Sequence, residues 1–259
     1  SFPTRRSSDL IPVYEQTETE ITVGAGDQLA RMPVDMFYRN SLYETLYYPN
    51  ELGFASGTIT GLKFYNSFAT NLPNKPTKIW LGITAQSELV AGGWIPSSQM
   101  VLVYDGLVSY PSGDNVISIT FAEPFYYTGG NLVMMVNRPM DTAYFSSNDR
   151  FHCQTVGTNR TLNSFSDSVT YYPDAPPTSG TLSGQFPKTT FVVTMMGGDP
   201  AFTVYPSTKN YGSVLLNEGS QQTYTIMNVG GGQLTINNIS LAGSPMFSLN
   251  DLPQFPVVL

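Results

Sequence analysis

A run of five apolar residues, Leu132 to Val136, stands between the pair Gly129-Gly130 and the polar residue Asn137. Such a run is too short for an isolated helix and is typical of a strand buried on both faces. We therefore predict a central core strand here. Because a strand with both faces buried offers no side chain to a ligand, we expect any function to lie on loops at the ends of the domain.

On both sides of this run, apolar and polar residues alternate with a period of two, which is typical of strands. The sets predicted to face inward are Leu62 and Phe64; Ile79, Leu81 and Ile83; and Ile117, Ile119 and Phe121. Trp80 should then point away from its neighbours, and the polar residues Ser118 and Thr120 indicate a strand with one solvated face. Gly61, inside its strand pattern, indicates a bulge.

Turn residues divide these strands from one another. The pair Asp105-Gly106 predicts a hairpin turn, and residues 111–115 predict a second one. Residues 92–99 form a predicted loop around Trp94 with a short turn that starts at a proline, and residues 47–53 allow at most one helical turn. Further strands are predicted at 100–104, 143–145, 151–154 and 189–195, and residues 163–187 are predicted to be a surface excursion.

A second, smaller pattern follows residues 196–200. Its predicted strands lie at 202–206, 211–214, 222–228, 234–241 and 246–249. A shift of phase at Asn237-Asn238 predicts a bulge. We therefore expect a β-sandwich domain at 11–197 and an incomplete domain at 198–259.

The composition agrees with an all-β chain that is rich in turns. Charged residues make up 12% of the 259 residues, against roughly 25% in ordinary globular domains. We predict a large antiparallel β-sandwich of jelly-roll type, followed by a truncated immunoglobulin-like β-sandwich. The net charge of −7 disfavours nucleic acid as a partner. No apolar run has the length that crosses a membrane, and the single cysteine, Cys153, excludes an intrachain disulfide.

The second pattern resembles a known family. The elements Tyr211-Gly212-Ser213-Val214, 224–230, Leu234-Thr235-Ile236 and Phe247-Ser248-Leu249 are similar to those of the abnormal-spindle/Hydin (choice-of-anchor D) immunoglobulin-like domain. Immunoglobulin-like domains run to about 100 residues. The resemblance therefore implies that the domain is incomplete in this chain.

The first pattern resembles the β-sandwich modules of secreted surface proteins of the Bacteroidota type. The motifs that carry this resemblance are residues 57–65, Trp94-Ile95-Pro96 with 103–106, and 125–133. The resemblance implies an adhesin-like or accessory role. Residues 1–10 resemble the translation of a sequencing adapter, which implies a metagenomic fragment whose native start, including any signal peptide, lies outside it, and we leave these residues out of the fold prediction.

The sequence offers few residues in patterns that are typical of catalytic sites. His152 is the only histidine and no Gly-x-Ser-x-Gly motif accompanies it, while its neighbour Cys153 should point to the opposite face of the strand. A glycosidase-type carboxylate pair would have to come from residues that the sequence does not pair. These candidates are Asp35, Glu44, Asp105, Glu123, Asp141 and Asp149. We therefore expect that the chain is not an enzyme.

No cofactor is predicted, and no complete set of metal ligands is found. The stretches Ser147-Asn148-Asp149 and Asp114-Asn115 carry oxygen donors that suit calcium. Ordinary Asx turns explain the same residues. A structural calcium ion stays an alternative.

Aromatic residues are the predicted binding residues. Trp94 in its glycine-rich loop, Trp80, and the pair Tyr126-Tyr127 would offer flat faces to sugar rings or to a partner protein. Packing in the core explains such residues equally well. Of the four, Trp94 is the first place to look, because it lies on a loop.

The expected function is the non-catalytic binding or display portion of a secreted or cell-surface modular bacterial protein, either adhesin-like or a spacer. Its partners would be carbohydrates or surface proteins. The alternative is a set of accessory domains, carbohydrate-binding ones included, of an extracellular protease or glycosidase whose catalytic domain lies outside this fragment.

Overall fold

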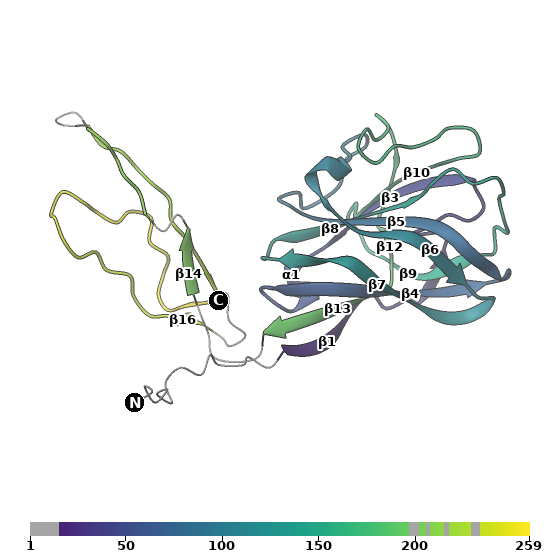
Figure 1. Cartoon of the computed structure of the whole chain (residues 1–259), viewed down its shortest axis with the longest axis horizontal. Helices are drawn as coiled ribbons and strands as arrows, with labels where there is room; N and C mark the ends of the chain where they lie inside the picture. The colour runs from purple at the N-terminus through teal and green to yellow at the C-terminus, as the bar shows by residue number, and fades with distance from the viewer. Residues whose placement is uncertain (1–15, 197–201, 206–207, 215–217, 229–233) are drawn as a thin grey trace, which may run out of the picture. The chain divides into compact units, whose positions relative to one another are not determined.

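The computed structural model describes residues 16–196, 202–205, 208–214, 218–228 and 234–259. The chain divides into two compact units, and the larger one comprises Glu18–Thr194. The adapter-like residues 1–10 and the boundary predicted between 197 and 198 lie outside the described residues. The larger unit is an all-β sandwich of two antiparallel sheets, which Figure 1 shows as two layers of strands.

One layer is a six-stranded sheet with the order β11-β10-β3-β8-β5-β6. Its strands are β3 (Asn40–Tyr47), β5 (Leu72–Thr84), β6 (Val101–Tyr110), β8 (Asn131–Arg138), β10 (Thr161–Ser166) and β11 (Thr181–Ser183). Strand β8 contains the apolar run Leu132 to Val136 and lies between β3 and β5, antiparallel to both. Every residue of β8 after Asn131 is buried. The prediction of a central strand buried on both faces is confirmed.

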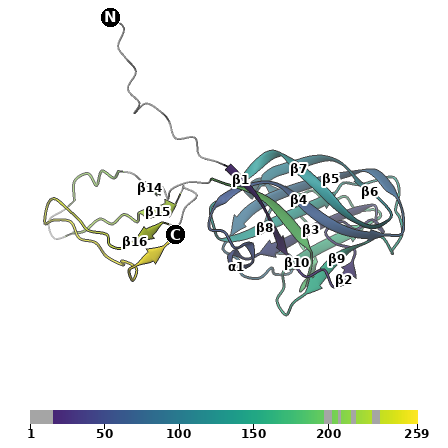
Figure 2. The ribbon, with the colours of Figure 1, turned by 90° about the horizontal axis from the view of Figure 1, so that it is seen from below.

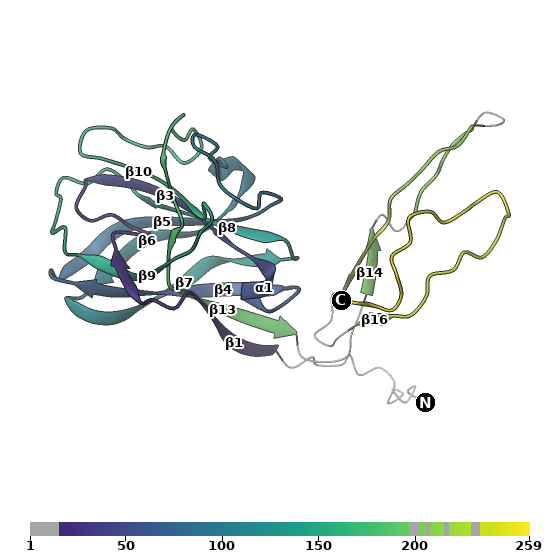
Figure 3. The same cartoon turned by 180° about the vertical axis from the view of Figure 1, so that it is seen from behind.

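The other layer is a seven-stranded sheet with the order β1-β13-β4-β9-β12, in which β7 also pairs with β4 and β2 with β9 (Figures 2 and 3). Its strands are β1 (Gln16–Val23), β2 (Gln28–Ala30), β4 (Gly57–Phe68), β7 (Gly113–Tyr127), β9 (Arg150–Thr155), β12 (Gln185–Pro187) and β13 (Thr189–Met196). The register of β4 with β7 shifts between Ile59 and Gly61. A Cβ at Gly61 would lie 2.7 Å from the carbonyl oxygen of Ile119, so the predicted bulge requires glycine there.

Aromatic side chains join the two sheets. The ring of Tyr110 on β6 lies 5.4 Å from that of Phe68 on β4 and 5.7 Å from that of Phe151 on β9. Tyr47 on β3 packs edge-on against Phe191 on β13 at 5.0 Å, and its hydroxyl is 2.9 Å from the hydroxyl of Thr189. Burial of such large rings between facing sheets is the main stabilising term of a sandwich core.

The outer face of the six-stranded sheet is covered by the loop of residues 85–100. Leu89, Trp94 and Ile95 from this loop pack on Trp80 and on side chains of the four strands β3, β5, β8 and β10. The loop is anchored by hydrogen bonds from the backbone N–H groups of Leu89 and Ser97 to the carbonyls of Asn159 and Pro173. It ends in a short 3₁₀ turn, η2 (Ser97–Gln99), after Pro96, as predicted. Strand β8 is thus covered by the sandwich on one face and by the loop on the other.

Two predicted hairpin turns are wrong. Asp105 and Gly106 lie inside the continuous strand β6, where they pair with Lys78 and Thr77 of β5. Gly106 leaves room for the ring of Tyr104, whose hydroxyl donates to the carbonyl of Leu107, so this glycine serves a close approach and not a turn. The chain does turn after Tyr110, but β6 and β7 belong to different sheets, so this turn crosses between the layers.

Three further expectations are corrected by backbone pairing. Residues 143–145 are not a strand, since the backbone of this segment is bonded elsewhere: the carbonyl of Ala143 accepts from Arg138 and the N–H of Phe145 donates to Met36. Residues 163–187 are only partly a surface excursion, because strands β10, β11 and β12 all include residues from this range. Ile83, predicted to face inward with Ile79 and Leu81, is 41% exposed near the end of β5.

The smaller helical and C-terminal elements are short. Helix α1 (Pro49–Leu52) is the single turn that was predicted. In the described part of residues 195–259, β14 (Phe202–Tyr205) pairs with β15 (Thr225–Asn228), and β16 (Thr235–Ile236) pairs with β17 (Val257–Val258). The predicted strands at 211–214 and 246–249 are not formed. The described hydrophobic side chains there are not buried, since two-stranded ribbons have no second layer to cover them.

Glu44 lies in the apolar layer between the six-stranded sheet and its covering loop. It is fully buried on β3, beside Leu42 and Leu46 in the alternation of that strand. Its Oε1 accepts a hydrogen bond of 2.9 Å from the backbone N–H of Ile95, and its Oε2 has no hydrogen-bond partner. Burial raises the pKa of Glu44 to about 8, so the carboxyl is largely protonated at neutral pH.

The raised pKa of Glu44 predicts a specific dependence of stability on pH. The folded chain holds this proton more tightly than the unfolded chain, so the free energy of unfolding falls as pH rises from the unfolded pKa of 4.5 through about 8. The fall is on the order of 5 kcal/mol. Glu44→Gln keeps the oxygen that accepts from Ile95 and lacks the proton, so it should lose this part of the dependence.

Urea unfolding at pH 5, 7 and 9 measures the effect. Glu44→Gln should be clearly more stable than the wild type at pH 9, with a smaller difference at pH 5. Glu123→Gln, at an exposed position of β7, is the matched control and should follow the wild type at every pH. Parallel curves for wild type and Glu44→Gln would contradict the assignment.

Candidate functional site

The four aromatic residues predicted to bind ligands are mostly buried. Trp80 and Trp94 are each 8% exposed and pack in the same apolar layer above the six-stranded sheet, where Trp94 Nε1 donates to the carbonyl of Ser179 at 2.8 Å. Tyr127 is 1% exposed, and its hydroxyl donates to the carbonyl of Gly130. Tyr126, 71% exposed on β7, is the one member of the set whose ring faces solvent. The other three rings present no face on which a sugar could stack.

Most of the candidate carboxylates have structural partners. Asp105 forms an ion pair of 2.8 Å with Lys78, and Asp141 forms one of 2.9 Å with Arg138. Asp149 is buried, and its two carboxylate oxygens accept from the backbone N–H groups of Thr70 and Ser146. These carboxylates therefore bind neighbouring side chains or backbone groups of the protein itself.

His152 and Cys153 point to opposite faces of β9, as predicted. Cys153 is fully buried, and burial raises the pKa of its thiol to about 12, which removes it as a nucleophile at neutral pH. His152 places Nδ1 at 3.1 Å from the carbonyl oxygen of Gly26 and Nε2 at 3.5 Å from Asp114 Oδ1. Within the described ranges no cluster of three or more His, Cys, Asp or Glu side chains could hold a metal ion. No helix in the described part of the chain is long and apolar enough to span a membrane.

A polar hollow of about 390 Å³ opens between the two sheets at the edge formed by β2, β10 and β11. This hollow, which we call the edge cleft, is lined by Leu29, Ala30, Arg31, Met32, Asp35, Tyr43, Arg150, Asn163, Phe165, Thr181, Leu182, Ser183 and Gln185. Its volume lies in the lower part of the range of about 300 to 1,000 Å³ that small-molecule sites occupy. The edge cleft is therefore the candidate functional site.

Strand pairing aligns one wall of the edge cleft. Tyr43 on β3, Asn163 on β10 and Thr181 on β11 are directly paired across the sheet, so their side chains share one face. Asn163 Nδ2 donates to the carbonyl of Thr181 at 3.0 Å, and the Tyr43 hydroxyl donates to the carbonyl of Arg31 at 2.9 Å. These bonds hold the polar row in place without a ligand.

Asp35 is the buried acidic group of the edge cleft. Its side chain is 1% exposed, Oδ1 accepts from the N–H of Phe37 at 3.0 Å, and Oδ2 lies 3.6 Å from Arg31 Nε without a hydrogen-bond partner. Burial raises the pKa of Asp35 to about 6, and the nearby charge of Arg31 opposes the rise. Oδ2 therefore takes part in an ion pair with Arg31 and makes no hydrogen bond.

Two arginines supply donors on the same cleft. The guanidinium of Arg31 lies over the rings of Phe37 and Phe165, with its Cζ at 5.0 and 5.8 Å from their centroids, in cation–π contact. Arg150 is exposed, and its Nε donates to the carbonyl of Ser147. The terminal N–H groups of both side chains make no hydrogen bond to the described residues.

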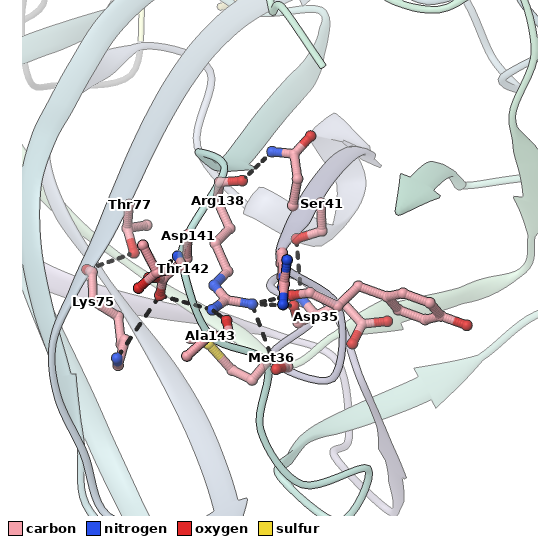
Figure 4. A network of polar contacts seen from close by, with 12 residues as sticks. Asp35, Met36, Ser41, Lys75, Thr77, Arg138, Asp141, Thr142 and Ala143 are labelled. Atoms are coloured by element: carbon pink, nitrogen blue, oxygen red, sulfur yellow. Dashed lines mark hydrogen bonds and ion pairs between the residues drawn. The ribbon is translucent and has the colours of Figure 1, made fainter. Parts of the chain in front are cut away.

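The backbone that carries Asp35 is held by Arg138 (Figure 4). This fully buried arginine on β8 donates to the carbonyls of Asp35, Met36 and Tyr38, and on its other side to the carbonyl of Ala143 and to Asp141. Arg138 thereby satisfies carbonyls that no strand pairs. The guanidinium group of Arg138 thus makes the hydrogen bonds that a neighbouring strand would make in a regular sheet.

A second hollow of about 310 Å³ lies near the edge cleft. It shares Asn163, Phe165 and Thr181 with the first and is otherwise lined by Ser164, Tyr171, Ser179 and Gly180. The loop that follows β10 forms its outer wall. Both hollows are lined by residues of β10.

Sequence reasoning did not find the edge cleft. None of the residues predicted to bind lines it, and of the candidate carboxylates only Asp35 does. Arg31, Arg150 and Asn163 are far apart in the chain and carry no motif. Pairing of β2 with β9 and of β10 with β11 brings them together, and short strands of three residues leave no periodic signal.

No family model, curated protein or solved structure matches this chain. The two resemblances drawn from the sequence therefore stay expectations. The assignment of function rests on the geometry of the cleft.

The role of Arg138 predicts a large loss of stability in Arg138→Lys. A lysine ammonium has three donors on one atom and cannot span carbonyls on both sides of the site. Buried carbonyls left unpaired cost about 1 to 3 kcal/mol each, so we expect a loss of roughly 2 to 4 kcal/mol in chemical denaturation. Arg150→Lys, at an exposed position, is the control and should change stability by less than about 0.5 kcal/mol. Equal stability of the two variants would contradict the structural role of Arg138.

Proposed function

We propose that this chain is a non-catalytic binding portion of a secreted or cell-surface modular bacterial protein, and that its ligand occupies the edge cleft. The observation that carries this proposal is the convergence of Asp35, Arg31 and Arg150 on one preformed hollow between the sheets. Groups held in place before a ligand arrives lower the entropic cost of binding.

The chemistry of the cleft supports binding over catalysis. Asp35 is the one carboxyl among its described lining residues, and neither His152 nor Cys153 lines it. General acid–base hydrolysis of a glycoside needs two carboxyl groups across the scissile bond. A single carboxyl beside donors instead suits recognition of a ligand rich in hydroxyl groups.

The alternative is an accessory domain of an extracellular hydrolase, and the same cleft favours a carbohydrate-binding one. Hydroxyl groups of a sugar donate and accept at once, which matches a cleft that offers both donors and acceptors. The two candidates agree on what this chain does, and differ in what lies beyond it. Sequencing the complete reading frame separates them.

Filling the cleft tests the proposal. Thr181 is exposed and lines both hollows, so Thr181→Trp should occupy the space of the ligand. The purified chain would be screened against immobilised pectin, alginate, xylan, cellulose and mucin. We expect saturable binding to at least one of them, weakened at least about tenfold by Thr181→Trp, since a blocked site loses its buried contacts.

Thr120→Trp, on the solvated face of β7, is the matched control and should bind as the wild type does. Binding that is equal in both variants would place the ligand elsewhere. No binding to any polymer would contradict the proposed function, and release of reducing sugar from them would contradict its non-catalytic part.

A further inference from the structure

We propose that the edge cleft selects an acidic sugar residue, one that carries a carboxylate or sulfate group, within an oligosaccharide. This inference rests on the proposed function and names its ligand class. It is carried by the arrangement of charges, unpaired groups and hollows along β10.

The charge of the cleft is opposite in sign to the net charge of the whole chain. The chain has a net charge of −7, yet the cleft places the two guanidinium groups of Arg31 and Arg150 against the single carboxyl of Asp35. Among the described residues, Arg150 has no carboxylate within 4 Å. An anionic group on the ligand would supply the missing partner, in the charge-assisted geometry that arginine forms with planar or tetrahedral oxyanions.

Other groups of the cleft suit the sugar rather than a bare anion. The carboxyl of Asp35 forms an ion pair with Arg31, and its negative charge disfavours an anion that lacks hydroxyl groups. Asn163 keeps its side-chain oxygen after its Nδ2 has bonded to Thr181, so an acceptor for a sugar hydroxyl lies in the wall of the cleft. The 44% exposed side chain of Leu29 adds apolar surface for the C–H groups of a sugar ring.

The neighbouring hollow indicates an oligosaccharide. It has a volume of about 310 Å³ and shares the lining residues Asn163, Phe165 and Thr181 with the cleft. A chain of sugars could follow the edge of β10, with the acidic residue beside Arg31 and Arg150. A trisaccharide should therefore bind more tightly than its monosaccharide.

Calorimetric titration of the full chain at pH 7 and low ionic strength tests this inference. The probes are trigalacturonic acid for the carboxylate, a sulfated carrageenan fragment for the sulfate, maltotriose as the neutral sugar, and citrate as the anion without a sugar ring. We expect one of the two acidic sugars to bind at least about tenfold more tightly than maltotriose and citrate, and to weaken as salt is added.

Arg150→Gln should lower the affinity for that acidic sugar at least about tenfold, since it removes a charge-assisted hydrogen bond. Lys78→Gln is the control, because Lys78 is a cation that lines neither hollow, and it should leave the affinity unchanged. Both variants should melt within a few degrees of the wild type.

The contradicting results separate this inference from the proposed function. Equal affinity for acidic and neutral trisaccharides, or an unchanged affinity in Arg150→Gln, would overturn the acidic-sugar assignment. The proposed binding function of the cleft would still stand. Citrate that binds as tightly as the acidic sugars would also overturn it. If no probe binds, and no polymer is retained in a manner sensitive to Thr181→Trp, both the inference and the proposed function fail.

Discussion

Both faces of the six-stranded sheet must be removed from water, and the rest of the larger unit follows from this constraint. Strand β8 is apolar on both sides, so the sandwich core covers one face and a separate layer is needed for the other. Residues 85–100 provide that layer and use Trp94 to do so, above Trp80. Both tryptophans therefore pack in the interior, and the candidate site lies at the open edge between the sheets.

At that edge, irregular backbone takes the place of strands, and arginines satisfy it. Arg138 bonds carbonyls in residues 35–38 and around 141–143, and so holds Asp35 at the base of the cleft. Arg160 has a similar role elsewhere, where it bonds the carbonyl of Leu46 and forms a bidentate pair with Glu51 over the ring of Phe186. In a chain with few charges, Arg138 and Arg160 are buried and bond backbone carbonyls, whereas Arg150 is exposed.

Much of the fold could be predicted from the alternation of apolar and polar residues. Little of the candidate site could be predicted in this way. The run at Leu132 to Val136 and the bulge at Gly61 are local patterns with one structural solution. The turn predicted at Asp105-Gly106 failed because glycine there serves the packing of Tyr104, which no local pattern reveals. Trp80 was correctly expected to face away from Ile79, but a sequence does not tell whether a loop covers it. The cleft depends on pairs such as Asn163 with Thr181, which arise only in the folded sheet.

The central claim is that this chain binds its ligand at the edge cleft and not on the loop that covers the sheet. Chemical-shift mapping of the isotope-labelled chain during titration with trigalacturonic acid tests it most directly. The account predicts that the side-chain amides of Asn163 and Gln185 and the backbone amides of residues 29–31 and 181–183 shift in a saturable manner. Shifts confined to residues 85–100 or to the solvated face of β7 around Tyr126 would contradict it.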